Sequence, residues 1–303
     1  MRWRKLGRVF TANRQRPWMQ SHTATPFAEP IGGDRLRIWF SPQDDANRWH
    51  LAWLEIDVTR PQYIHKLAQV PTLAPGPKGR FDDQGTMGSW LTDLGAEQRL
   101  YYIGWTSADP NPYQVAIGLA IGHDKGTSFS RRSPNAIFDR NDSDPIYVSA
   151  PCVLKADPSW HMWYVTAIDW PKGAAAPDST IRHATSKDGV SWVPDDGTCV
   201  EFQHTGECGL ARPCVVMDND CWRMWFCYRT RDSAFRIGYA ESPDGESWTR
   251  NDDRGGLDTG SEDWDSEMVA YPHVFDLNGE RYMLYSGNGF GEAGMGLAVL
   301  ETD

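Results

Sequence analysis

Residues 210–248 contain LARPCVV from Leu210, WRMWFCY from Trp222, RIGYAES from Arg236 and DGESW from Asp244 to Trp248. Apolar and polar residues alternate in each piece, and Asp, Gly and Pro residues separate the pieces. This pattern predicts four short strands joined by tight turns. The same order of signals recurs along the chain, so the stretch represents one unit of a repeated structure.

A strand rich in aromatic residues returns at a regular interval. Its copies are centred on Trp39, Tyr102, Trp163, Trp225 and Leu284, with spacings of 63, 61, 62 and 59 residues. A proline that precedes this strand repeats as Pro26, Pro151, Pro213 and Pro272, with Met87-Gly-Ser in its place in the second copy. Four strand signals in each copy predict an all-β chain built from one repeated sheet.

Five copies of about 60 residues are typical of a five-bladed β-propeller, in which radial repetition leaves only short sheet edges. We expect a single domain over 1–303, with blades at approximately 20–80, 81–143, 144–204, 205–262 and 263–303. The fifth copy stops before its last strand, and we expect residues 3–10 to supply that strand and close the ring. A β-sandwich or two smaller β domains would not produce a five-fold period.

Composition and charge narrow the function. Across 303 residues the chain has 15 Trp, 28 Gly and 20 Pro, which favours strands and tight turns over helices. The net charge of −11 argues against nucleic acid or an anionic membrane as a partner. No apolar run approaches membrane-spanning length, and the basic N-terminus lacks the apolar segment of a signal peptide. These features predict a cytoplasmic location and leave the oligomeric state open.

The six cysteines are predicted to be reduced and structural. None forms a Cys-x-x-Cys pair, which argues against a zinc site. Cys152 and Cys214 each follow a proline in a predicted strand, where a thiol acts as a small apolar filler. No cofactor is predicted, and a structural cation on the axis stays open.

Acidic residues precede several of the repeated prolines. Asp144, Glu207 and Glu267 lie seven, six and five residues before their prolines, and Asp82 and Asp83 precede Gly85 in the second copy. The first strand of each propeller blade lines the central channel, so these carboxylates are expected to meet there. Carboxylates brought together shift one another's pKa and suit glycoside cleavage by an acid and a base or nucleophile. The alternative is that they are ordinary loop–strand junction residues in a chain with 41 Asp and Glu.

Other polar and aromatic residues are candidates for substrate binding. Arg212, directly before Pro213, is expected near the axis, where it could hold a carboxylate, a sugar hydroxyl or a phosphate. His22 and His273 could bind hydroxyls or be packed histidines, and Trp105 could stack on a sugar face. Asn288 begins a glycine-flanked loop that allows backbone to approach a ligand closely. Asp82 joins this binding set.

The motif Ser-x-Asp-Gly-x-x-Trp occurs at residues 186–192 and 242–248. Asp and Gly make a tight turn in which the Asp side chain accepts backbone N–H bonds, and the Trp packs between sheets. We therefore predict that this motif belongs to the scaffold.

The chain resembles the five-bladed propeller glycosidase superfamily of invertase- and levansucrase-like enzymes, arabinanases, xylosidases and mannoside phosphorylases. More closely, it is similar to bacterial proteins described as glycosylases and associated with polysaccharide biosynthesis. The segments that carry the resemblance are Phe81-Asp-Asp-Gln-Gly-Thr-Met, Ala150-Pro-Cys-Val-Leu, Ala211-Arg-Pro, Arg236-Ile-Gly-Tyr-Ala-Glu-Ser, Trp264-Asp-Ser-Glu-Met, Tyr282-Met-Leu-Tyr-Ser-Gly-Asn-Gly and Gly296-Leu-Ala-Val-Leu-Glu.

The resemblance implies roles for three acids, with Asp83 as base or nucleophile, Asp144 as transition-state stabiliser and Glu207 as general acid. Glu267 is a reserve acid. The Asn-Asp-Pro nucleophile motif of the first blade is absent, since Pro26-Phe-Ala-Glu-Pro has no matching Asp. That departure weakens an assignment as a fructoside hydrolase.

Three functions follow as hypotheses. The first is a glycoside hydrolase-like enzyme that acts on a sugar or glycan in the central channel by carboxylate acid/base chemistry. The second is a non-catalytic carbohydrate-binding propeller in a polysaccharide pathway. The third is a phosphorylase, transferase or cyclase that uses the same pocket on an activated sugar, because a fold alone does not decide function.

Overall fold

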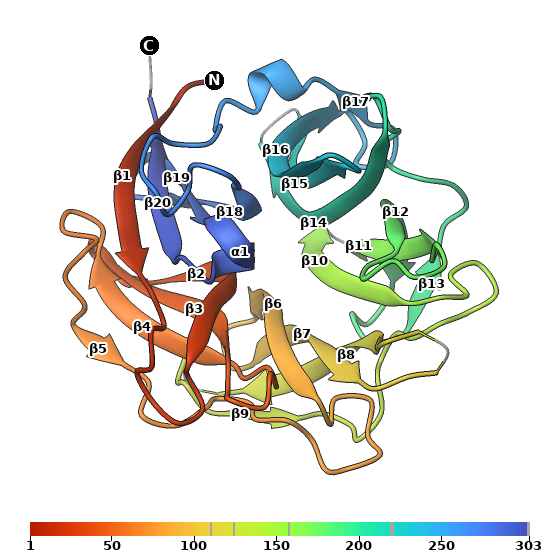
Figure 1. Cartoon of the computed structure of the whole chain (residues 1–303), viewed down its shortest axis with the longest axis horizontal. Coiled ribbons are helices and arrows are strands. Elements are labelled where there is room, and N and C mark those ends of the chain that lie inside the picture. The colour runs from red at the N-terminus through yellow and green to blue at the C-terminus, as the bar shows by residue number, and fades with distance from the viewer. Residues whose placement is uncertain (110, 124, 157, 219–220, 302–303) are drawn as a thin grey trace.

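The computed structural model describes residues 1–303 except 110, 124, 157, 219–220 and 302–303. Its strands form antiparallel sheets that stand around a common centre, as Figure 1 shows. Besides the strands, the described residues contain only the short helical turns η1 (Asp252–Arg254) and α1 (Asn288–Gly291). The all-β prediction is confirmed.

Two separate sheets of four strands follow one another along the first half of the chain. The first runs in the order β2 (Ser21–Gly32), β3 (Arg35–Gln43), β4 (Ala52–Asp57) and β5 (Lys66–Leu67). The second runs in the order β6 (Gly85–Asp93), β7 (Gln98–Thr106), β8 (Gln114–Gly122) and β9 (Phe129–Arg131).

The next eight strands form one sheet with a weak join in its middle. One antiparallel run holds β10 (Val148–Ala156), β11 (Ser159–Asp169), β12 (Asp178–Ser186) and β13 (Trp192–Pro194). The other holds β14 (Glu207–Met217), β15 (Trp222–Thr230), β16 (Ser233–Ser242) and β17 (Thr249–Arg250). A single parallel pair, Ser179 with Gly209, connects β12 to β14.

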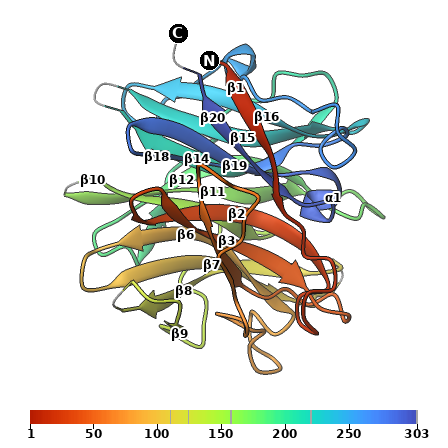
Figure 2. The ribbon, with the colours of Figure 1, turned by 90° about the vertical axis from the view of Figure 1, so that its left-hand side faces the viewer.

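The last sheet combines strands from both ends of the chain. It holds β18 (Ala270–Leu277), β19 (Glu280–Ser286), β20 (Met295–Leu300) and, at its edge, β1 (Trp3–Phe10). β1 is antiparallel to β20, with Trp3 opposite Leu300, and Figure 2 shows the two strands side by side. The Trp3 indole donates a hydrogen bond to the Gly255 carbonyl at 2.9 Å and meets the Trp225 ring edge-on at 6.2 Å. The N-terminal strand is thereby attached to the β15–β16 region as well as to β20.

The first strand of each repeat lies nearest the axis. β2, β6, β10, β14 and β18 contact one another in a closed cycle, and the predicted aromatic strands are the second strands β3, β7, β11, β15 and β19. This radial arrangement of sheets is that of a β-propeller. The repeated proline therefore marks the inner strand, as the sequence predicts.

Four of the five inner strands, β2, β10, β14 and β18, share a backbone irregularity at the residue before the proline. Thr25, Ala150, Arg212 and Tyr271 all have positive φ, between 46° and 56°. In each of these strands the pairing with the second strand shifts register at this point. A left-handed conformation at a non-glycine residue costs on the order of 1–3 kcal/mol and is found where structure elsewhere over-determines it. All four residues line one pocket on the axis.

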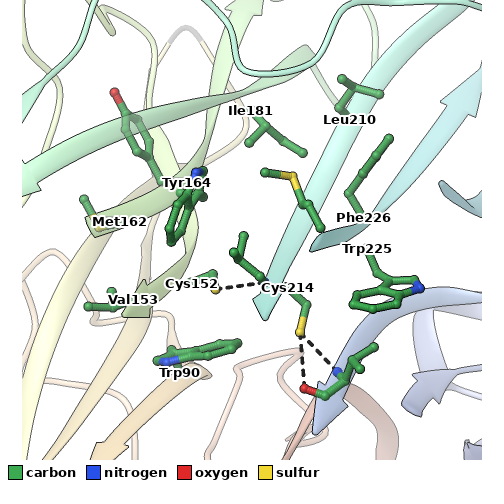
Figure 3. Packing of buried hydrophobic residues seen from close by; sticks show 14 of the residues in the cluster. Trp90, Cys152, Val153, Met162, Tyr164, Ile181, Leu210, Cys214, Trp225 and Phe226 are labelled. Carbon is green, nitrogen blue, oxygen red and sulfur yellow. Dashed lines mark hydrogen bonds between the residues drawn. The ribbon is translucent and has the colours of Figure 1, made fainter. Parts of the chain in front are cut away.

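Aromatic rings and thiols pack the space between neighbouring sheets (Figure 3). The Cys152 sulfur accepts a hydrogen bond from the Val215 amide at 3.2 Å, and the Cys214 sulfur accepts one from the Val274 amide at 3.1 Å. Each thiol thus links one inner strand to the next. All six cysteines are free.

The two Ser-x-Asp-Gly-x-x-Trp segments form tight turns. In each, Asp Oδ1 accepts backbone amides two and three residues ahead, at 2.8 and 2.7 Å for Asp188 and at 2.9 and 2.8 Å for Asp244. Backbone donation at this turn lowers the pKa of both carboxyls. The tight turn predicted for this motif is confirmed. No helix in the described part of the chain is long and apolar enough to cross a membrane.

Candidate functional site

A pocket of about 490 Å³ lies on the axis among the inner strands. Its volume falls within the range of small-molecule sites in proteins. The lining comes from the first three strands of the repeats and from the loops beside them. It comprises His22, Ala24, Thr25, Gln43, Trp49, Met87, Ile103, Trp105, Tyr113, Tyr147, Ser149, Ala150, Val165, Ala176, Pro177, Ser179, Ala211, Arg212, Arg229, Phe235, Tyr271 and Phe290.

Two groups of aromatic rings dominate this lining. In the first group, the ring centroid of Trp105 lies 6.3 Å from that of Trp49 and 4.7 Å from that of Tyr113. The Trp105 indole nitrogen has no hydrogen-bond partner among the described residues. The second is made of Phe235, Tyr271 and Phe290, with ring centroids 6.1 to 6.4 Å apart. Phe290 is 48% exposed and projects from the short turn α1. The rings offer flat apolar faces to a ligand that also needs polar partners.

Two arginines and a histidine are the basic side chains of the pocket lining. Arg212 is completely buried, and its Nη1 donates to Ser89 Oγ at 3.1 Å. Arg229 Nη2 donates to the Pro177 carbonyl at 2.8 Å. His22 Nδ1 lies 2.7 Å from Ser21 Oγ, and burial lowers the pKa of this imidazole although Glu292 acts in the opposite direction. None of the described residues that line the pocket is an Asp or a Glu.

Asp82 and Asp144 are buried outside this lining, in matching arrangements. The Tyr102 hydroxyl donates to Asp82 at 3.2 Å and the Tyr164 hydroxyl donates to Asp144 at 2.8 Å, in each case from 20 residues further along the chain. Arg131 pairs with Asp82 at 2.6 Å, and Arg182 pairs with Asp144 at 3.0 Å. These carboxylates join the loop before an inner strand to the second or outer strands of the same sheet.

Asp265 is the third member of this set. The Tyr285 hydroxyl donates to it at 3.1 Å and Lys5 of β1 pairs with it at 2.7 Å. Asp265 precedes Pro272 by seven residues, just as Asp144 precedes Pro151. That spacing identifies the repeat position in the last sheet, which Glu267 does not occupy.

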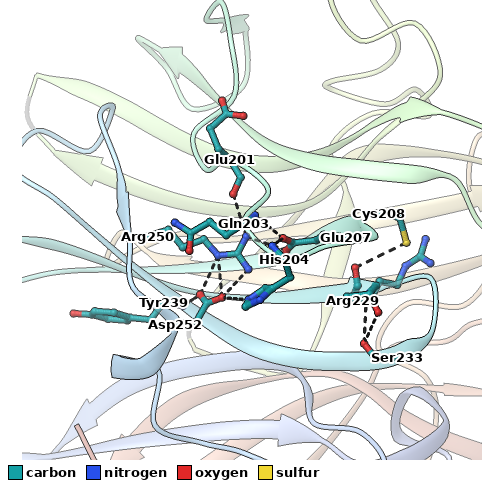
Figure 4. A network of polar contacts seen from close by, with 11 residues as sticks. Glu201, Gln203, His204, Glu207, Cys208, Arg229, Ser233, Tyr239, Arg250 and Asp252 are labelled. Carbon is teal, nitrogen blue, oxygen red and sulfur yellow. Dashed lines mark hydrogen bonds and ion pairs between the residues drawn. The ribbon is translucent and has the colours of Figure 1, made fainter.

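Glu207 lies in the network of Figure 4. Its side chain is fully buried, pairs with Arg250 Nη1 at 2.9 Å, and accepts the backbone amides of Gln203 and His204 at 2.7 and 2.9 Å. Arg250 also pairs with Asp252 at 2.7 Å. Burial by itself would raise the pKa of Asp252, but hydrogen bonds from Arg250 and His204 leave it lowered.

The other predicted acids lie closer to the surface. Asp83 is half-buried, and its carboxylate accepts the Thr106 hydroxyl at 2.8 Å and the Gly79 amide at 2.9 Å. Glu267 is exposed, and its backbone amide donates to the Asn288 side chain at 2.9 Å. Neither residue lines the pocket.

The predicted binding residues separate into two groups. His22, Trp105 and Arg212 line the axial pocket, whereas Asp82, His273 and Asn288 do not. His273 is buried with its ring 6.2 Å from Phe27 and 5.1 Å from Trp90. Asn288 holds the preceding loop, since its amide donates to the Asp263 carbonyl at 2.6 Å and its oxygen accepts the amides of Glu267 and Met268.

Sequence reasoning missed most of the pocket lining. Thr25, Ala150 and Tyr271 precede the repeated proline just as Arg212 does, so the repeat itself could have identified them. Trp49, Tyr113 and Phe290 lie in the connections between second and third strands, whose length and sequence differ from sheet to sheet, so no periodic signal marks them. Among the described residues, no group of three or more His, Cys, Asp or Glu side chains is arranged to hold a metal ion.

Comparison with known sequences gives close relatives of the same length. No family model matches the chain. It is 38% identical over 302 residues to uncharacterized protein MT1551 of Mycobacterium tuberculosis strain CDC 1551 / Oshkosh, and equally to uncharacterized protein Rv1502 of strain H37Rv. Both alignments cover 100% of this chain and 100% of the relative.

Comparison with solved structures supports the propeller fold. A BT0996 RGII complex superposes with a TM-score of 0.77 at 16% identity, covering 98% of this chain and 91% of that protein. A glycoside hydrolase gives 0.76 at 16% identity, covering 99% and 92%. A thermostable family-43 glycoside hydrolase gives 0.69 at 13% identity, covering 97% and 93%. At these identities the likeness is one of fold.

Proposed function

The chain belongs to the family of the Mycobacterium tuberculosis proteins MT1551 and Rv1502, and we propose that it is a glycosidase-like, five-bladed propeller that binds a sugar in its axial pocket. The closed cycle of five inner strands supports the blade count. The single pair that joins β12 to β14 supports division of the eight-stranded sheet into two blades. The cytoplasmic location and the association with polysaccharide biosynthesis stay predictions from the sequence.

One observation carries the sugar assignment: the pocket combines flat aromatic faces with donors that lack partners. Trp49, Trp105 and Tyr113 offer one group of rings, and the Trp105 indole nitrogen has no hydrogen-bond acceptor. A sugar presents apolar C–H faces to rings and oxygen acceptors at its rim, so it satisfies both features together. The glycoside hydrolases that share the fold make a carbohydrate ligand the natural class to test.

The position of the carboxylates favours binding over hydrolysis by the predicted acids. Glycoside cleavage requires two carboxyl groups on either side of the scissile bond. Asp144 and Glu207 are held in ion pairs with Arg182 and Arg250, and neither lines the pocket. We therefore propose scaffold roles for both, and the non-catalytic carbohydrate-binding hypothesis has the stronger support.

The first test measures sugar binding directly. Tryptophan fluorescence and titration calorimetry with neutral and acidic mono- and disaccharides should show saturable binding to the wild type. Trp105→Ala should weaken that binding by about tenfold, equivalent to about 1.4 kcal/mol, because a ring face and a donor are lost together. Tyr63→Ala removes an aromatic side chain that is 63% exposed and outside the pocket, and it should bind like the wild type.

A turnover assay on the sugars that bind separates the hydrolase hypothesis from the binding hypothesis. If the wild type cleaves a glycoside and Glu207→Gln or Asp83→Asn folds normally but loses that activity, the carboxylate mechanism is correct. Undiminished sugar binding in both variants, without turnover by the wild type, supports the binding protein. Absence of binding to every sugar would overturn the proposed function itself.

A further inference from the structure

We propose that the ligand of the axial pocket carries an anionic group, a carboxylate or a phosphate, and that Arg212 is the residue that binds it. This inference rests on the proposed function, since it names the class of sugar that the pocket takes. The observations that carry it are the burial of Arg212, its incomplete hydrogen bonding and the charge of its surroundings.

Arg212 is a fully buried cation with most of its donors unused. It is 0% exposed, and its one hydrogen bond runs from Nη1 to Ser89 Oγ at 3.1 Å. Nε and Nη2 have no partner. Buried polar groups in folded proteins are nearly always paired, and an isolated buried charge is far more costly than an isolated amide. Because Arg212 also lines the axial pocket, we assign its unused donors to a ligand of that pocket.

The surroundings of Arg212 offer no compensating negative charge. Its electrostatic neighbours include Cys152, Cys214 and Tyr271, and burial raises the pKa of each of these groups, to about 11 for Cys214. They are therefore neutral at pH 7. No carboxylate of the described residues forms an ion pair with Arg212, and Arg229 adds a second cation to the lining. The pocket is thus electropositive in a chain whose net charge is −11.

The backbone at Arg212 is adapted to this position. Its φ is 51°, and the strand pairing shifts register between Ala211 and Cys214. The same bulge in β2, β10 and β18 carries Thr25, Ala150 and Tyr271, so the fold itself does not require an arginine there. Among the four residues with this conformation, only Arg212 has a charged side chain.

The geometry of a guanidinium selects the ligand chemistry. Its planar fork of N–H donors matches the two oxygens of a carboxylate or of a phosphate, and charge-assisted bonds of this type are about twice as strong as neutral ones. Aromatic rings around it would hold the sugar ring that bears the anion. Uronic acids and sugar phosphates are the two sources of this chemistry.

The experiment compares the wild type with Arg212→Met and Arg212→Lys. Glucuronate, galacturonate and glucose 1-phosphate are titrated beside glucose and galactose, and inorganic phosphate and acetate are titrated alone by thermal shift. We expect anionic ligands to bind at least tenfold more tightly than their neutral counterparts. Arg212→Met should lose that preference entirely, and Arg212→Lys should retain only part of it because lysine lacks the planar fork.

Stability distinguishes a ligand-binding arginine from a structural one. Replacement of an unpaired buried charge by an apolar side chain of similar length is neutral or stabilising, so Arg212→Met should melt at the wild-type temperature or above. A large fall in melting temperature would assign Arg212 to the scaffold and overturn the inference. Arg132→Met, at an exposed arginine outside the pocket, is the control for loss of a positive charge.

These titrations distinguish sugar binding from anion binding by Arg212, and a uronic acid from a sugar phosphate as the ligand. Tighter binding of uronates and acetate identifies a carboxylate ligand, and tighter binding of glucose 1-phosphate and inorganic phosphate identifies a phosphate. If neutral sugars bind as tightly as anionic ones, the inference fails while the proposed function stands. If anions stabilise the wild type and Arg212→Met equally, Arg212 is not their site. If neither neutral nor anionic sugars bind, the proposed function is wrong, and the inference about Arg212 is wrong with it.

Discussion

His273 follows Pro272 in β18 and is buried between the rings of Phe27 and Trp90. Burial and the nearby charge of Arg212 hold the pKa of this imidazole well below its usual value, so it is neutral in the folded protein at pH 7. Phe27 follows the repeated proline in β2 in the same way, so an apolar ring fits this position elsewhere in the ring.

The depressed pKa of His273 makes stability depend on pH in a defined direction. As pH falls below about 6.5, the unfolded chain binds a proton at this residue and the folded chain does not, so stability is lost on acidification. The wild type should lose up to about 1.4 kcal/mol per pH unit more than His273→Phe in this range. Denaturant unfolding from pH 7.5 to 5 measures the difference, and parallel pH profiles would contradict it. His65→Gln, at an exposed histidine, is the control.

The acidic residues show what spacing alone can predict. Asp144 lies in the loop that precedes the inner strand β10, and its carboxylate accepts the Tyr164 hydroxyl and pairs with Arg182 instead of lining the pocket. Spacing places a residue along a strand, whereas the direction of its side chain depends on partners from other strands that a linear pattern does not identify. Arg212 does line the pocket, because it occupies the bulge itself.

At the scale of elements, the sequence repeat predicts the inner strands and the aromatic second strands, because each sheet packs against its neighbours in the same way. The repeat does not predict the pocket walls, because Trp49 and Phe290 lie in connections between strands that differ in length and sequence from sheet to sheet. Binding residues often lie on variable loops held by a rigid scaffold, and such residues do not recur at the spacing of the repeated strands.

β1 should contribute strongly to stability through Trp3. This residue is 6% exposed, hydrogen bonds to Gly255 and packs on Trp225. Trp3→Ala should therefore cost about 3–5 kcal/mol, as large-to-small changes at buried tryptophans do. Chemical denaturation measures the loss. Arg4→Ala, on the exposed side of the same strand, should change stability by less than about 0.5 kcal/mol, and an equal loss in both variants would mean that strand pairing rather than the Trp3 contact is responsible.

At the scale of the whole molecule, the buried thiols report on the integrity of the ring. Cys152 and Cys214 lie on the inner strands β10 and β14, and Cys227 lies on β15 against Tyr271 of β18. Burial raises the pKa of each thiol, to about 11 for Cys214 and about 12 for Cys227. A thiol-specific reagent at pH 8 should therefore modify none of the three cysteines in the native protein, because the reagent cannot reach the buried sulfurs and the thiols remain protonated at this pH.

All three thiols should become reactive together when the sheets separate. Mass spectrometry of the labelled protein at increasing denaturant checks this expectation, and Trp3→Ala should shift the labelling to lower denaturant. Labelling of Cys214 well before Cys152 would show that the sheets separate one at a time. The half-buried Cys221, which lies in a loop, is an internal reference for early labelling.

The pairing of β1 with β20 also has a consequence for biosynthesis. Because Trp3 lies opposite Leu300, β1 leaves the ribosome long before the strand with which it pairs. At about 5–20 residues per second, that wait lasts roughly 15–60 s for a chain of 303 residues. During this time β1 remains an unpaired strand with an exposed tryptophan, while later sheets are already forming. On polysomes that carry several such nascent chains, β1 of one chain could occupy the free edge of β20 in a neighbour, so rapid overexpression should favour strand-exchanged dimers.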